Sequence, residues 1–165
     1  MRDFQFAAAM EASIRQEIER LMDFSPQELQ PAMAMLGKFQ AEFELILDRV
    51  QLTNVDVGSY PTIHAENLLG PDSAWQQIAE HFGAAQDKTA ANLAVLWAVY
   101  ALMEKSGQFY QQAALNSPHP STRLLLASLG EVKSMARRRV DALLRVMYNE
   151  VWADVGFAPS KLGKD

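Results

Sequence analysis

The chain has 165 residues, an apolar fraction of 49% and a formal net charge of -5, from 20 acidic against 15 basic side chains. A chain of this length can bury one sizeable core without disulfides or a structural metal. The absence of cysteine excludes disulfides, thiolate zinc sites, iron–sulfur clusters and cysteine nucleophiles, and the mild acidity argues against nucleic acid as a partner.

The first half of the chain predicts two long helices. Apolar residues recur at helical spacing over 3–22, and they do so again over 26–51. Between these ranges, Ser25 is placed as an N-cap, Pro26 as the first helical residue and Glu28 as the third. We therefore expect a tight connection between the two helices.

The middle of the chain predicts a long connection. Residues that break helices recur through 54–71. Asp72 and Ser73 are candidate caps of a short helix that follows, and Gly83 would end it. The second and third long helices should therefore be far apart along the chain.

Two further long helices are expected in the second half, over 88–115 and 122–151, with a tight turn at 116–121. One long and two short connections are typical of a ferritin-like four-helix bundle with a single long crossover. We expect an all-α protein in which residues 1–155 form this bundle and residues 156–165 form a flexible tail.

Each long helix carries an apolar stripe that one polar residue interrupts. The stripes comprise Phe4, Ala7, Glu11, Ile14, Ile18 and Leu21; Met33, Leu36, Gln40, Phe43, Leu47 and Val50; Leu93, Trp97, Tyr100, Glu104 and Gly107; and Leu126, Leu129, Lys133, Ala136, Val140 and Leu143. An unpaired buried charge is costly. Glu11, Gln40, Glu104 and Lys133 should therefore meet in one central polar cluster.

An internal repeat supports this arrangement. A shift of 93 residues places Glu11 on Glu104 and Gln40 on Lys133, and it also aligns residues 34–37 with 127–130. One offset therefore serves both pairs of helices, as a duplicated helical hairpin would require.

Residues 101–110, ALMEKSGQFY, resemble the rubrerythrin pattern, in which a Glu precedes a Phe-Tyr pair on the third helix of a ferritin-like bundle. The resemblance implies a di-iron centre to which the first and third helices each give one Glu, while the second and fourth each give Glu-x-x-His. It implies Glu11 and Glu104 as metal ligands, and a non-haem iron oxidoreductase acting on peroxide or oxygen.

The remaining ligand positions depart from that pattern. Gln40 and Phe43 stand where the second helix should carry Glu and His, and Lys133 and Ala136 stand there on the fourth. Two carboxylates alone cannot hold two irons. The sequence therefore predicts a degenerate centre with no cofactor, unless iron is retained through other ligands.

Four alternatives concern how the centre is now filled. The Lys133 ammonium could neutralise the carboxylates, or it could reach solvent from a slightly rotated helix. Phe43 and Ala136 could leave an apolar cavity where the histidines would stand. Retained iron would need other ligands, such as His64, Glu66 or an inward shift of Glu42, Glu44 or Glu131.

The sequence carries no glycine-rich phosphate loop, no G-x-S-x-G and no HExxH. We therefore assign no catalytic residue and interpret the chain as a binding or structural module. Its expected form is a homodimer, the commonest homo-oligomer. The start of the chain lacks the pattern of a secretory signal, and no apolar run approaches the about 20 residues of a membrane span, so we expect a cytoplasmic protein without membrane contact.

Overall fold

The computed structural model describes residues 2–52, 63–85 and 90–154, and within these ranges all regular structure is helical. The expected all-α class is confirmed. The predicted tail at 156–165 lies outside the described residues. The long helices are α1 (Arg2–Phe24), α2 (Gln30–Leu52), α5 (Ala90–Asn116) and α6 (Pro120–Asp154). The short ones are η1 (Gln27–Leu29), α3 (Ala65–Leu69) and α4 (Asp72–Ala84).

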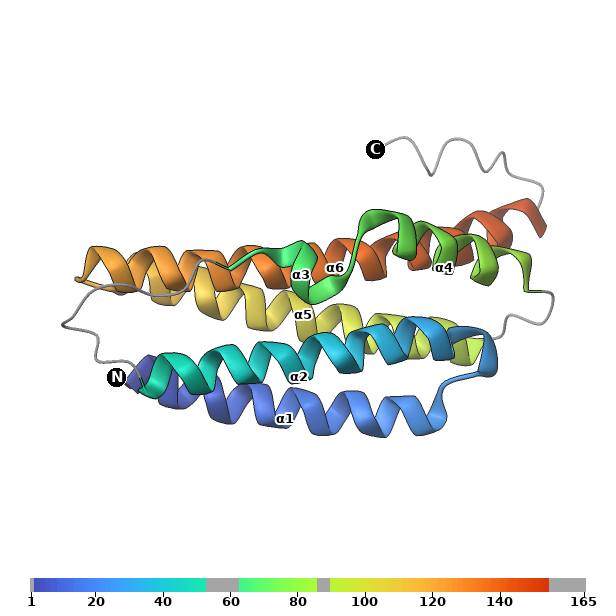
Figure 1. Cartoon of the computed structure of the whole chain (residues 1–165). Coiled ribbons are helices and arrows are strands. Elements are labelled where there is room, and N and C mark those ends of the chain that lie inside the picture. The colour runs from blue at the N-terminus through green and yellow to red at the C-terminus, as the bar shows by residue number, and fades with distance from the viewer. Residues whose placement is uncertain (1, 53–62, 86–89, 155–165) are drawn as a thin grey trace.

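The long helices lie side by side as two antiparallel pairs, α1 with α2 and α5 with α6 (Figure 1). Helix α2 ends at the opposite end of the bundle from the start of α5, so these two helices run in the same direction (Figure 1). Between them in the chain, α3 and α4 contact both α2 and α6. The two short helices therefore cover the seam between α2 and α6.

The connection between α1 and α2 differs from the predicted cap. The Ser25 hydroxyl donates to the Leu21 carbonyl at 2.6 Å and so closes the end of α1. The next helix starts with η1, whose N-cap is Pro26, without a side-chain hydrogen bond. The Gln30 amide donates to the carbonyls of Met22 and Ser25. The prediction of Ser25 as an N-cap is therefore wrong, because its hydroxyl is hydrogen-bonded to the last turn of α1.

The predicted caps of the short helix are also wrong. Helix α4 has Pro71 as its N-cap, again without a side-chain hydrogen bond. Asp72 is instead the first residue of the helix and forms an ion pair with Arg139 of α6. The Trp75 indole N–H donates to the Leu69 carbonyl at 2.5 Å. These contacts hold α4 against α6 and against the unpredicted helix α3.

The predicted stripes of α1, α2 and α6 are confirmed, since every residue in them is buried. The stripe of α5 is wrong. Trp97 is 43% exposed, whereas Leu96, Val99 and Met103 are fully buried. Residues on every side of the first half of α5 are mostly apolar, so its sequence does not specify one inward face. Contacts with the other helices decide the rotation, and they place the buried face about one residue away from the predicted one.

Gly107 and Gly130 face each other between α5 and α6 at the level of Lys133. A Cβ on Gly107 would lie 3.5 Å from the Lys133 Cβ and 3.8 Å from the Gly130 carbonyl oxygen. A Cβ on Gly130 would lie 3.5 Å from the Gly107 carbonyl oxygen. The backbones therefore pass each other where Lys133 enters the core.

None of the helices in the described ranges combines the length and apolarity that a membrane crossing requires.

Gly70 should be sensitive to substitution. It ends α3 with φ 82° and ψ 169°, a conformation that is essentially confined to glycine, and an added Cβ would lie 2.9 Å from the Met35 Cε. We expect Gly70→Ala to lower the free energy of unfolding by about 1 to 3 kcal/mol in urea denaturation. Gly37→Ala is the matched control, because its Cβ would meet the Met22 sulfur at an ordinary 3.5 Å. Equal stability of the two variants would contradict this account of Gly70.

Candidate functional site

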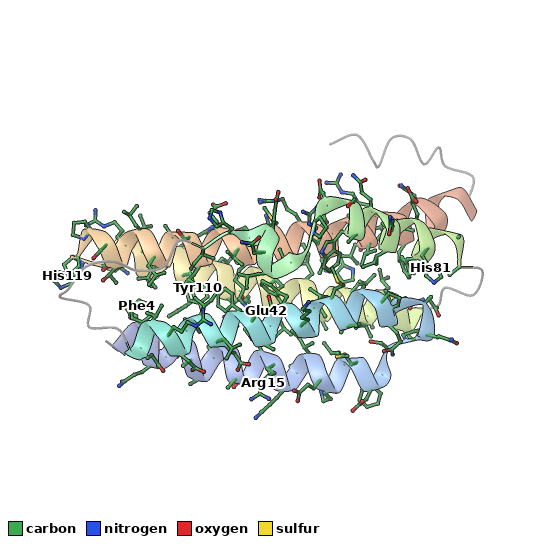
Figure 2. The ribbon with its side chains drawn as sticks, viewed as in Figure 1. Phe4, Arg15, Glu42, His81, Tyr110 and His119 are labelled. Carbon is green, nitrogen blue, oxygen red and sulfur yellow. The ribbon has the colours of Figure 1, made fainter. Side chains whose placement is uncertain are left out.

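The centre of the bundle holds a polar network around the Glu11 carboxylate. Its Oε2 accepts hydrogen bonds from Lys133 Nζ at 2.7 Å and Gln40 Nε2 at 2.5 Å, and its Oε1 accepts one from the Tyr110 hydroxyl at 2.9 Å. Each of these four side chains is fully buried and comes from a different long helix. Figure 2 labels Tyr110 in the middle of the bundle. We call these four residues the central network.

Lys133 has further partners within the central network. Its ammonium donates to Gln40 Oε1 at 3.0 Å, and it lies 4.3 Å from the ring centroid of Phe43 and 5.4 Å from that of Phe39. These rings stabilise a desolvated cation through their negative faces. The alternative in which Lys133 reaches solvent is wrong, because its exposure is 0%.

Gln40 links the Glu11–Lys133 ion pair to the main chain of α1. Its amide nitrogen donates to the Glu11 main-chain carbonyl at 3.1 Å as well as to the carboxylate, while its oxygen accepts from Lys133. Both ends of the amide are therefore used, as a buried amide requires.

Burial and charge act on two titratable groups of the network. Burial lowers the pKa of the Lys133 ammonium, and the neighbouring Glu11 carboxylate opposes that shift. Burial and the Glu11 carboxylate together raise the pKa of the Tyr110 phenol. Tyr110 therefore remains a protonated donor to Glu11 throughout the ordinary pH range.

Glu104 makes none of the hydrogen bonds described for the network. It is half-buried beside Gly107, Gln108, Ser134 and Arg137. The rotation of α5 explains this placement, since it brings Tyr110 to the centre and Glu104 to the rim. The structure thus brings together Glu11, Gln40 and Lys133, whereas Glu104 lies apart from them.

Tyr110 entered the sequence analysis only as part of the Phe-Tyr pair, and its contact with Glu11 was not predicted. A signal for it exists, because Tyr110 follows the buried Met103 by two helical turns and so lies on the same face. The stripe predicted for α5 does not include Tyr110, so this signal goes unused in it.

Phe43 and Ala136, the residues expected to line an apolar cavity, are both fully buried. The Phe43 ring contacts the Lys133 ammonium, and its centroid lies 5.6 Å from that of Tyr110 and 5.9 Å from that of Phe39. Lys133 therefore occupies space beside Phe43 that the sequence analysis assigned to a cavity.

The donor set around Glu11 does not fit a di-iron centre. All three groups that contact its carboxylate donate hydrogen bonds, and an ammonium has no lone pair for a metal. Across the described ranges, no group of three or more His, Asp or Glu side chains is arranged to hold a metal ion. The centre is built to neutralise one carboxylate.

The alternative ligands of the sequence analysis lie outside the core. His64, Glu66 and Glu131 are exposed, and Glu42 and Glu44 are partly exposed. Glu44 forms an ion pair with Arg15 at 2.9 Å, and Figure 2 shows Arg15 on the outer side of α1. His81 and His119 are also exposed, near opposite ends of the bundle (Figure 2).

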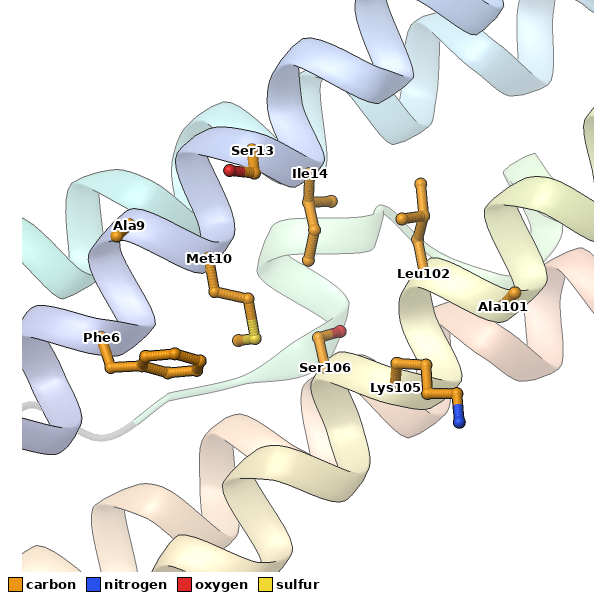
Figure 3. Close-up of a pocket in the computed structure, with 9 residues that line it drawn as sticks. All are labelled: Phe6, Ala9, Met10, Ser13, Ile14, Ala101, Leu102, Lys105 and Ser106. Carbon is orange, nitrogen blue, oxygen red and sulfur yellow. The ribbon is translucent and has the colours of Figure 1, made fainter.

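An apolar groove of about 560 Å³ lies between α1 and α5. The residues that line it are Phe6, Ala9, Met10, Ser13, Ile14, Ala101, Leu102, Lys105 and Ser106 (Figure 3). Phe6 is 58% exposed although it is aromatic, and the exposed Lys105 lies at the edge of the groove. Pockets for small molecules have volumes of this order.

Comparison with known proteins gives no relative: no family model, no curated protein and no solved structure matches the chain.

Loss of Lys133 should destabilise the protein strongly. Lys133→Met leaves the Glu11 carboxylate buried without its cation, so we expect the free energy of unfolding to fall by about 3 to 5 kcal/mol. Lys105→Met is the control, because that side chain is exposed and its loss should change stability by less than about 0.5 kcal/mol. Thermal melting that is the same for both variants would show that Lys133 has no structural role.

Tyr110 should make the protein sensitive to alkali. Its raised pKa means that the unfolded chain releases the phenolic proton near pH 10 while the native chain retains it. The stability that Tyr110 contributes is therefore complete below about pH 10 and falls by about 1.4 kcal/mol per pH unit above it. Tyr110→Phe should be less stable than wild type at pH 7, and this difference should shrink above pH 10 in urea titrations. A constant difference would contradict the assignment.

Proposed function

We propose that the chain is a ferritin-like bundle of rubrerythrin type, with one long crossover between α2 and α5, whose di-iron centre has been replaced by a salt-bridged polar network. It acts as a binding or structural module. The observation that carries this proposal is the Lys133 ammonium, buried 2.7 Å from the Glu11 carboxylate at a position where the family resemblance implies a metal ligand.

Several features support the ferritin-like part of the proposal. Helices α2 and α5 run in the same direction, which a single long crossover between them requires (Figure 1). Gln40 and Lys133, which the repeat of 93 residues relates, are hydrogen-bonded to each other. A duplicated helical hairpin would bring equivalent positions together at its symmetry axis in this way.

The binding part of the proposal rests on the groove between α1 and α5. A solvent-exposed Phe6 beside Met10, in a groove that Leu102 also lines, is typical of a site that an apolar ligand covers (Figure 3). The expected homodimer stays a prediction.

The second candidate is the iron-dependent oxidoreductase that the resemblance implies. It would require Glu11 to exchange three hydrogen-bond donors for a metal and Glu104 to turn inward from the rim. The geometry therefore favours the first proposal.

Metal analysis separates the two candidates. We expect protein that is expressed in iron-supplemented medium and purified without chelators to contain far less than one iron per chain. The variant Glu11→Ala, Glu104→Ala should have the same content. About two irons per chain in wild type, lost in the variant, would establish the oxidoreductase instead.

Binding at the groove can be tested with a fluorescent naphthalene sulfonate dye. Ala9 is exposed on the groove wall, so Ala9→Trp should fill the groove without disturbing the core and weaken dye binding about tenfold, which corresponds to about 1.4 kcal/mol. Ala127→Trp, on an exposed position of α6, is the matched control and should leave binding unchanged. Equal affinity of both variants would place the dye elsewhere.

A further inference from the structure

The Lys133 amine contacts a carboxamide, with which it could form a new amide bond, and a carboxylate, which could carry the proton. Its Nζ lies 3.0 Å from the carboxamide oxygen of Gln40 and 2.7 Å from Glu11 Oε2. The same Glu11 oxygen accepts a hydrogen bond from the carboxamide nitrogen of Gln40 at 2.5 Å. One carboxylate oxygen is therefore in reach of a primary amine and of the nitrogen that would leave an amide.

We propose that Lys133 and Gln40 form an intramolecular isopeptide bond, with Glu11 as the group that transfers the proton. The lone pair of Lys133 Nζ forms a bond to Gln40 Cδ, and the bond between Cδ and Nε2 breaks. Nε2 leaves as ammonia, taking up a proton that Nζ has given to Glu11. An amine and a primary amide thus become a secondary amide and ammonia, and nothing is oxidised or reduced.

In these surroundings the ion pair can give way to uncharged reactants. Lys133, Glu11 and Gln40 have exposures of 0%, and the rings of Phe39 and Phe43 lie against the amine. In such a setting a proton can pass from Lys133 to Glu11, because a neutral amine and a neutral acid avoid the desolvation of two charges. The neutral amine is the nucleophile, and the protonated acid is the donor that the departing nitrogen needs.

The network also provides positioning and excludes water. The Tyr110 hydroxyl donates to Glu11 Oε1 and so holds Oε2 toward the other two groups. Amine and carboxamide are held on neighbouring helices at near-contact distance, which raises their effective concentration. Attack requires the face of the carboxamide, which a rotation about the Gln40 Cγ–Cδ bond presents to Nζ. Burial keeps out the water that would hydrolyse the amide instead.

This inference does not depend on the proposed function, because it needs only the contacts among the three side chains. Its product would be a covalent link between α2 and α6, which are 93 residues apart at these positions.

Intact-mass spectrometry tests the proposal. Folded wild-type chain, incubated and then denatured, should be lighter than its sequence mass by one ammonia. Digestion with trypsin should give a branched peptide that joins residues 39–49 to residues 124–137, because trypsin does not cleave at a cross-linked Lys133. Full sequence mass after incubation would overturn the proposal. Loss of a water would also overturn it, because it would place the link on a carboxyl group rather than on the carboxamide of Gln40.

Variants separate the cross-link from other routes that release ammonia. Lys133→Met and Gln40→Met each remove one reactant, and Glu11→Gln keeps both reactants but removes the proton carrier. All three should retain their full sequence mass. Gln112→Met, an exposed position on α5, should lose ammonia as wild type does. Ammonia loss that persists in Lys133→Met, or that yields no branched peptide, would overturn the proposal even if another variant failed to fold.

Discussion

The buried ion pair between Glu11 and Lys133 is the contact on which the rest of the structure depends. A lone carboxylate inside a helical bundle is strongly unfavourable, and here one ammonium, one amide and one phenol satisfy it. Each of these groups comes from a different long helix. The central network therefore constrains the register of all four long helices, because a shift of any one of them would remove a hydrogen-bond partner from the buried Glu11 carboxylate or remove that carboxylate itself.

The same contacts determine what the centre can do. Three donors on one carboxylate leave it unsuited to a hard metal ion, so the chemistry that remains is that of an amine, an amide and a proton carrier in a dry setting. Binding, by contrast, is favoured at the surface, where the groove between α1 and α5 exposes Phe6. The interior and the groove therefore have separate roles in the proposed function.

The inward face of a helix is predictable where polar and apolar residues alternate clearly along it. On α1, α2 and α6, polar residues border a single apolar stripe on each helix, so the sequence alone places Glu11, Gln40 and Lys133 at the centre. Helix α5 is apolar over most of its first half, so its inward face depends on the neighbouring helices. The predicted stripe therefore puts Glu104 in the central network, where the folded chain has Tyr110. The helix ends are the least predictable part, since the Ser25 hydroxyl can hydrogen-bond to either of two helices and only the folded chain shows which one it contacts.

A double-mutant cycle on Glu11 and Lys133 tests the central claim most directly. Glu11→Leu, Lys133→Met and the double variant would be compared by urea denaturation with wild-type chain of full sequence mass, in which Lys133 is still a free amine. We predict that the double variant loses about 2 to 3 kcal/mol less than the sum of the two single losses, because removing both charges leaves neither of them buried alone. Losses that add within about 0.5 kcal/mol would contradict the account, since they would mean that the two side chains do not interact in the folded protein.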